Sequence, residues 1–68
     1  MSIHYEIVVE GGLGPRLAGA IEGFEAIATE EGTTRLVGWV RDQSDLQGKL
    51  RRVSDLGLEL VSVARLAD

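Results

Sequence analysis

The strongest constraint on the fold is the shortness of the chain, which has 68 residues, no cysteine and one histidine. A chain of this size predicts a single domain over residues 1–68, with one small core. Apolar burial and the entropy of ordering nearly cancel for so small a domain. Neither a disulfide nor a structural zinc site can make up the difference with this composition. Self-association is the stabilising device that remains, so we expect a homo-oligomer, most simply a dimer.

The composition narrows the classes of partner. A hydrophobic share of 44% with 26% charged residues is typical of a globular domain and not of a disordered one. The net charge of −4 disfavours nucleic acid and anionic membrane surfaces as partners. No apolar run approaches about 18 residues and the first residues do not resemble a secretion signal, so we expect a cytoplasmic protein. No motif calls for a cofactor or a metal ion.

The first third of the chain predicts a strand followed by a short helix. Residues 3–9 alternate in hydropathy, as a strand does, with one face formed by Ile3, Tyr5, Ile7 and Val9. A glycine-rich break follows, and Pro15 then suits the first position of a helix. Apolar residues at 17, 21 and 24 have helical spacing and predict a helix over 15–22. Gly19 and Gly23 each weaken that helix by about 1 kcal/mol relative to alanine.

The rest of the chain predicts a hairpin, a second helix and a last strand. Residues 25–31 and 34–41 form the two arms of a hairpin around Gly32, which supplies a positive φ. Asp42 then caps a helix, with Asp45 near the positive end of its dipole. Gly57 ends that helix, and residues 58–66 form the last strand. The apolar stripe of the helix consists of Leu46, Leu50, Val53 and Leu56.

This element order predicts an α+β fold, a ferredoxin-like βαββαβ sandwich with two helices on one face of a four-stranded antiparallel sheet. The helix side takes Ile3, Tyr5, Ile7, Leu36 and Val40, with Gly38 leaving room beneath a helix. The other, open face takes His4, Glu6, Val8, Ile27, Thr29, Arg35, Val37, Trp39 and Arg41. The last strand adds either Val61 and Val63 or Leu58 and Leu60, and we expect the two valines beside Trp39. A patch of this kind is large for a monomer.

Three hypotheses can explain the half-apolar open face. The favoured one is self-association of two sheets, packed face to face around a two-fold axis. The second is a pocket for a small ligand, or a docking surface for a protein partner. RNA binding is disfavoured, because the central strands offer His4 and Trp39 but no aromatic pair, and the net charge is negative.

Few residues carry candidate chemistry. His4 and Glu6 lie on the same strand face and can form a proton-transfer pair, although a solvated histidine is the simpler interpretation. There is no cysteine nucleophile, and no serine has a base nearby in the sequence. Helix capping accounts for Asp42 and Asp45. The balance favours a protein that is not an enzyme; the alternative is a small dimeric α/β-barrel-type enzyme that uses His4 and Trp39.

Two groups of glycines stand out. Gly12 and Gly14 precede the first predicted helix and can present backbone N–H groups to an anion, although a tight turn is the simpler interpretation. The loop matches neither the dinucleotide fingerprint nor the P-loop. Gly48 lies inside the second helix opposite its apolar stripe, where alanine would serve better. A close contact with a neighbour is the only explanation that the sequence offers for Gly48.

The element order, together with Gly12 and Gly14, resembles ACT-type regulatory domains. That resemblance implies a ferredoxin-like module that dimerises and binds amino acids near the turn after the first strand. The segments Asp42-Gln43-Ser44-Asp45-Leu46-Gln47-Gly48 and Asp55-Leu56-Gly57-Leu58-Glu59-Leu60 also resemble a group of small stand-alone bacterial proteins, common in actinobacteria and of unknown function. This second resemblance implies a stand-alone protein and assigns no site.

The sequence therefore predicts a small, non-enzymatic, dimeric interaction or ligand-sensing module. The residues that we expect to bind a ligand or partner are Trp39, His4, Glu6, Val37, Arg41, Gly12 and Gly14.

Overall fold

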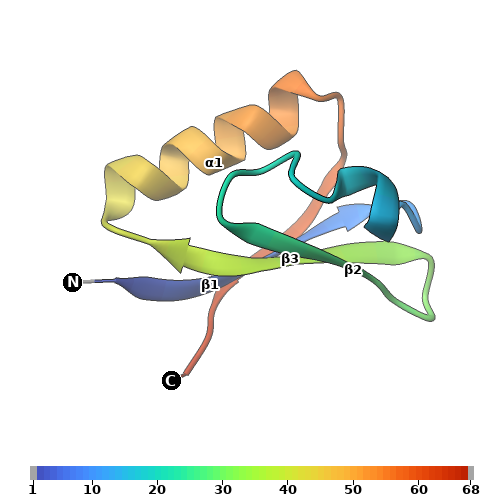
Figure 1. The fold of residues 1–68 in the computed structure, drawn as a ribbon, viewed down its shortest axis with the longest axis horizontal. Coiled ribbons are helices and arrows are strands. Elements are labelled where there is room, and N and C mark those ends of the chain that lie inside the picture. The colour runs from blue at the N-terminus through green and yellow to red at the C-terminus, as the bar shows by residue number, and fades with distance from the viewer. Residues whose placement is uncertain (1, 68) are drawn as a thin grey trace.

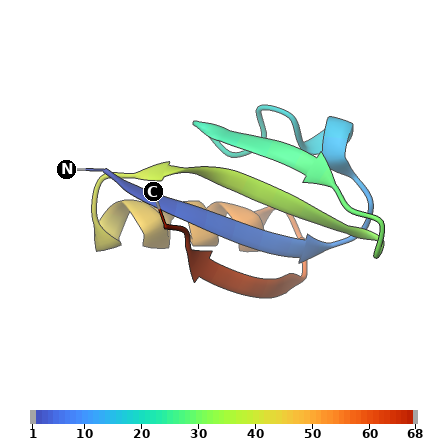
Figure 2. The same cartoon turned by 90° about the horizontal axis from the view of Figure 1, so that it is seen from below.

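A computed structural model describes residues 2–67 and contains one antiparallel sheet with one α-helix lying across it (Figure 1). The elements are β1 (Ile3–Glu10), the 3-10 turn η1 (Gly14–Leu17), β2 (Phe24–Ala28), β3 (Thr33–Val40), α1 (Gln43–Asp55) and β4 (Leu60–Arg65). The strands lie in the order β2-β3-β1-β4, so that β1 and β3 form the centre (Figure 2). Figure 2 views the sheet from the side opposite α1, and no helix crosses that face.

The prediction of a βαββαβ sandwich with two helices is wrong, and the ACT-like pattern fails with it. Residues 15–22 form no α-helix, and η1 is the single helical turn in that part of the chain. The reason lies in the backbone, because Gly19 and Gly23 both have a φ of +79°. A right-handed helix cannot continue through left-handed residues. The apolar residues that suggested a helix are nevertheless buried, so the segment covers the sheet as a loop.

The second predicted helix is confirmed at both ends. The Asp42 carboxylate accepts a hydrogen bond from the Asp45 N–H at 2.9 Å, which caps the first turn. Gly57 follows the last turn with a φ of +75°. Its N–H donates to the Ser54 carbonyl, and the next N–H, of Leu58, donates to the Val53 carbonyl. These two bonds form a Schellman motif, so the helix ends at Gly57, where the sequence predicted its end.

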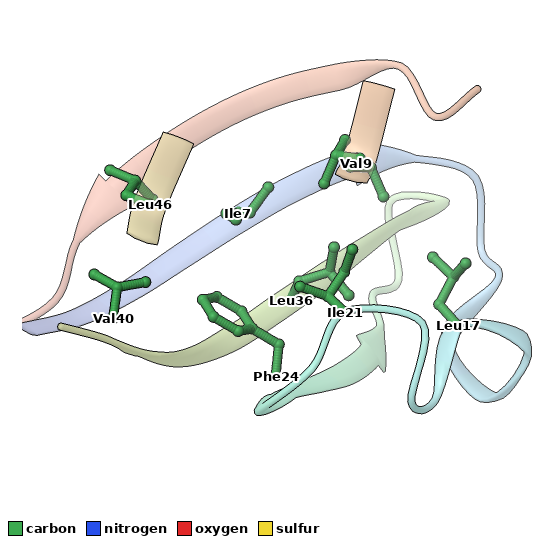
Figure 3. Packing of buried hydrophobic residues seen from close by; sticks show 9 residues of the cluster. Ile7, Val9, Leu17, Ile21, Phe24, Leu36, Val40 and Leu46 are labelled. Atoms are coloured by element: carbon green, nitrogen blue, oxygen red, sulfur yellow. The ribbon is translucent and has the colours of Figure 1, made fainter. Parts of the chain in front are cut away.

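The core lies between the sheet and the layer formed by α1 and the 11–23 loop (Figure 3). Ile7, Val9 and Leu36 on the central strands are fully buried. The helix contributes Leu46 and Val53, and the loop and the start of β2 contribute Leu17, Ile21 and Phe24. The loop therefore supplies as much of the upper layer of the core as the helix does.

Gly38 confirms the expected need for space, but the segment above it is not a helix. A Cβ at this position would lie 2.6 Å from the Gly23 carbonyl oxygen and 2.6 Å from the Phe24 ring. The buried Thr34 hydroxyl fastens the loop at its other end, since it donates to the Gly11 carbonyl at 2.6 Å and accepts from the Leu13 N–H at 2.9 Å. Close packing and these bonds hold the loop on the sheet in place of a helix.

The register confirms most of the predicted face assignment. Ile3, Tyr5 and Ile7 lie opposite Val40, Gly38 and Leu36 on the side covered by α1 and the loop. The expectation that Val63 would join the open face is wrong, whereas Val61 has no partner in the register of β4. Val63 lies opposite Ile7, on the covered side, and a bulge in β4 shifts the register between Val8 and Val9. Leu58 and Leu60 do not lie on the open face either: Leu58 packs against the core and Leu60 lies opposite Val9.

Candidate functional site

The side of the sheet without a helix brings together four of the seven predicted binding residues. His4 is the cross-strand partner of Trp39, and Glu6 is the partner of Val37. Residues directly opposite each other in an antiparallel pair lie on the same face, a few ångströms apart. We call this surface the open face and define it by the residues His4, Glu6, Val8, Glu25, Ile27, Arg35, Val37, Trp39, Ser62 and Ala64.

Trp39 is the most prominent side chain of the open face. Its ring stacks on the His4 imidazole, with 4.3 Å between the ring centroids and 10° between the planes. Trp39 is still 50% exposed, and Ile27 on β2 is 42% exposed. Aromatic side chains carry large apolar areas, so an indole held in place and half in water is suited to contact with another surface.

An ion pair lies at the centre of the open face. Arg35 on β3 donates from Nε to the Glu6 carboxylate on β1 at 2.5 Å. The Glu6 side chain is 20% exposed, and Val8 and Val37 flank the pair on the two central strands. The carboxylate is thereby engaged by Arg35, and among residues 2–67 no hydrogen bond joins it to His4. The His4–Glu6 proton-transfer pair, the less favoured interpretation of these residues, is therefore not formed.

The β4 side of the open face is shallow. Ser62 lies opposite Val8, and Ala64 lies opposite Glu6. Both are exposed and small, whereas β3 presents Arg35, Val37 and Trp39 on the other side of β1. The side chains of the open face therefore extend further from the sheet over β3 than they do at Ser62 and Ala64 on β4. The sequence missed this difference because both faces of residues 58–66 contain apolar residues, so that hydropathy did not determine which residues face out.

The structure separates Arg41, Gly12 and Gly14 from the open face. Arg41 follows β3, and its side chain, 83% exposed, lies with Nε 3.8 Å from the Asp45 carboxylate. Gly12 lies in open space, since a Cβ added to it would meet no atom within 4 Å. A Cβ on Gly14 would lie 2.7 Å from the Ala28 backbone nitrogen, so this glycine serves the packing of η1 against β2. The glycine turn is therefore explained by close packing and brings no binding group to the open face.

A groove that the sequence did not predict lies on the covered side, between residues 19–22 and the first turns of α1. It encloses about 650 Å³. Its charged and polar lining consists of Glu22, Arg41, Asp42, Ser44, Asp45, Lys49 and Arg52. Lys49 Nζ lies 3.6 Å from Asp45, and Arg52 Nε donates to the Ala20 carbonyl at 3.4 Å. The only signal in the sequence was the spacing of Asp45, Lys49 and Arg52 along one side of the helix.

Asp45 connects several of these groups. The Arg41 backbone N–H donates to its carboxylate at 2.9 Å, and this bond is the main reason that the pKa of Asp45 lies below its ordinary value. Partial burial acts in the opposite direction, and the positive charges of Lys49 and Arg41 lower the pKa further. Asp45 thereby holds the start of α1 to the end of β3.

Gly48 borders the same groove. It lies in the interior of α1 without a positive φ, and a Cβ there would meet no atom within 4 Å. The close contact that the sequence suggested for Gly48 is therefore absent within the described part of the chain. Packing inside the chain does not account for this glycine.

Comparison with known proteins gives one match. A family model described as a domain of unknown function (DUF8691) matches residues 4–64. The chain belongs to this family. The range begins at His4 and ends at Ala64, so the DUF8691 domain contains every residue of the open face. Searches of curated proteins and of solved structures gave no match.

The DUF8691 match agrees with the predicted resemblance to small proteins of unknown function. No three His, Asp or Glu side chains of residues 2–67 are grouped so that they could hold a metal ion. Nor does any helix within these residues have the length and hydropathy to cross a membrane. The strongest arrangement of functional groups is the open face, which offers a stacked indole, apolar side chains and an internally neutralised ion pair. Such a surface is suited to docking.

Proposed function

We propose that this DUF8691 protein is a non-enzymatic interaction module that forms a homodimer through its open face. The observation that carries the proposal is the half-exposed Trp39, stacked on His4 and next to Val37 on the same face. The Glu6–Arg35 pair supports it, because a charge that is already paired costs less to bury than a lone one. A cytoplasmic, actinobacterial-type protein without nucleic-acid or membrane partners is part of the same proposal.

The small size of the domain supports a second copy as the occupant. Nine apolar side chains make up its buried core, and all of them lie on the covered side of the sheet or in the layer above it. Burying Trp39 in a dimer would add apolar contacts that the single chain lacks, at about 25 cal/mol per Å². A dimer would thus provide stability that a chain without disulfides has few other means to gain.

The test combines light scattering with tryptophan emission, since Trp39 is the only tryptophan. We expect a dimer at micromolar concentration, with emission typical of a shielded indole. Trp39→Ser should give a folded monomer. Leu60→Ser is the matched control, because Leu60 is 48% exposed but does not lie on the open face, and it should remain a dimer. A wild-type monomer with a solvated indole at tens of micromolar would overturn the proposal.

Ligand sensing is the second candidate, and the groove beside Gly48 is what favours it. A helical glycine with empty space above it allows a small molecule to approach the helix backbone. A thermal melt against a panel of metabolites tests this, because a ligand at 100 times its dissociation constant adds about 2.7 kcal/mol. Gly48→Leu should abolish any such shift by filling the groove, and the absence of a shift across the panel would count against the idea.

The enzymatic alternative based on His4 has less support. Glu6, the partner that His4 would need, is engaged by Arg35, and the His4 ring lies against Trp39. Arg41, the other expected supporting residue, interacts with Asp45 away from the open face. A His4→Ala variant that loses a measured activity while it remains a folded dimer would restore this alternative.

A further inference from the structure

We infer that the two copies pack with β3 of each lying over β4 of the other, so that the large side chains of one open face fill the shallow side of its partner's. This arrangement rests on the proposed dimer and adds to it a specific set of contacts. It follows from the unequal height of the open face, which the register of β4 creates.

The two sides of β1 differ in side-chain size at two levels of the open face. At one level Arg35, Val8 and Ser62 lie side by side, and at the next Val37, Glu6 and Ala64 do so. Trp39 and His4 occupy the level beyond, where the Leu66 N–H donates to the His4 carbonyl at 2.8 Å. At the Ser62 and Ala64 levels, large residues therefore follow β3 and small ones follow β4, whereas Leu66 follows β4 at the His4 level.

A two-fold axis that runs parallel to the strands, above β1, places the side with large residues of one copy over the side with small residues of the other. Neighbouring strands are about 4.8 Å apart, so β3 and β4 are equally distant from β1, on opposite sides of it. Rotation about this axis places β3 of one copy over β4 of the other. Packed sheets are about 10 Å apart and interdigitate best when large side chains face small ones. Val37 would then face Ala64, and the Trp39 indole would cover the end of β4 beyond Ala64.

The polar groups also match under this rotation. Arg35 uses its Nε for Glu6, which leaves its remaining guanidinium N–H groups free to donate to the Ser62 hydroxyl of the second copy. The two Glu6 carboxylates face each other near the axis, and each is paired with the Arg35 of its own chain. Val8 meets its own counterpart. A two-fold axis perpendicular to the strands would instead place each residue over a different level of the partner's sheet. Arg35 would then not face Ser62 of the second copy.

The native chain contains no cysteine, so single introduced thiols report contacts between copies. We expect a short bismaleimide to crosslink an equimolar mixture of Val37→Cys and Ala64→Cys chains, one of them tagged, mainly into mixed dimers. Either variant alone should crosslink at least tenfold less. Val8→Cys alone should crosslink to itself, because Val8 lies near the axis. Leu60→Cys, off the open face, is the control for random collision.

The outcomes separate this inference from the proposed dimer. If light scattering shows a dimer but Val37→Cys crosslinks mainly to itself, the open face is the interface and the arrangement is wrong. If the protein is a monomer and no pair exceeds the Leu60→Cys control, the proposed function fails first. As a second measurement, Ala64→Trp should weaken dimerisation at least tenfold by filling the shallow side. Ala18→Trp, an equally large change in the exposed part of the loop, should leave dimerisation unchanged.

Discussion

Two crossover segments cover the same side of the sheet, and only one of them is a helix. Residues 11–23 connect β1 to β2, and residues 41–59 connect β3 to β4. Both carry apolar residues at roughly helical spacing, and both bury them against the strands. The first forms a loop with one 3-10 turn, whereas the second forms the 13-residue helix α1. Apolar spacing thus shows that a segment will be buried, but does not decide its local conformation.

The difference lies in the residues between the apolar positions. The loop contains Gly11, Gly19 and Gly23, all with positive φ, and is fastened by the Thr34 hydroxyl. The helix has a capping aspartate at its start and its positive-φ glycine only after its end. A glycine with positive φ inside a segment breaks a helix, and one just beyond a segment ends it. The position of the glycines separates the two crossovers.

The largest expected effect comes from emptying the core under each crossover. Ile21 in the loop is 1% exposed and Leu46 in α1 is 4% exposed. We expect Ile21→Ala and Leu46→Ala to lower the free energy of unfolding by similar amounts, about 2–5 kcal/mol each. Urea denaturation measures both changes. A cost below about 1 kcal/mol for Ile21→Ala alone would show that the loop is not a true part of the core.

The next effect concerns the close approach of the loop to β3. In Gly38→Ala the new methyl group would lie 2.6 Å from the Gly23 carbonyl oxygen, so the loop must move. We expect a loss of about 1–3 kcal/mol, because overpacking forces shifts of this kind. Gly12→Ala is the control, since Gly12 has no positive φ and no atom within 4 Å of an added Cβ. Equal stability of the two variants would contradict the packing of Gly23 on Gly38.

A glycine-to-alanine change should have opposite signs in the two crossovers. Gly19→Ala in the loop places a Cβ at a φ of +79°, and we expect it to destabilise the protein by about 1–2 kcal/mol. Gly48→Ala in α1 meets no neighbour and improves helix propensity, so we expect a gain of about 1 kcal/mol. Thermal or urea unfolding gives both signs. A destabilised Gly48→Ala variant would mean that this glycine has a structural role within the protein itself.

How much the sequence predicted depends on whether a local signal marked each feature. Asp42 and Gly57 are local signals, and both ends of α1 were predicted correctly. The alternation of β1 and the need for space at Gly38 were also predictable from period and size. The conformation of residues 15–22 was predicted wrongly. The helical spacing of three apolar residues was given more weight than the two glycines, Gly19 and Gly23. Trp39 was placed correctly on the open face, but the register of β4 places Ser62 and Ala64 on that face and Val63 on the covered side.

The smallest expected effect is a pH dependence that belongs to the helical crossover. The Arg41 N–H, together with nearby positive charges, lowers the pKa of Asp45 in the folded state. A carboxyl whose pKa is lower in the folded state than in the unfolded state stabilises the fold above its unfolded pKa, about 4, and that contribution is lost as the pH falls through the folded pKa. We therefore expect Asp45→Asn to be less stable than wild type at pH 7 and the difference to shrink as the pH falls below about 4. Urea midpoints measured across that range check the sign, and a difference that grows on acidification would contradict the Arg41–Asp45 contact as the cause. The effect stays small because α1 keeps its Asp42 cap and the buried Leu46 and Val53, which do not depend on the Asp45 carboxylate.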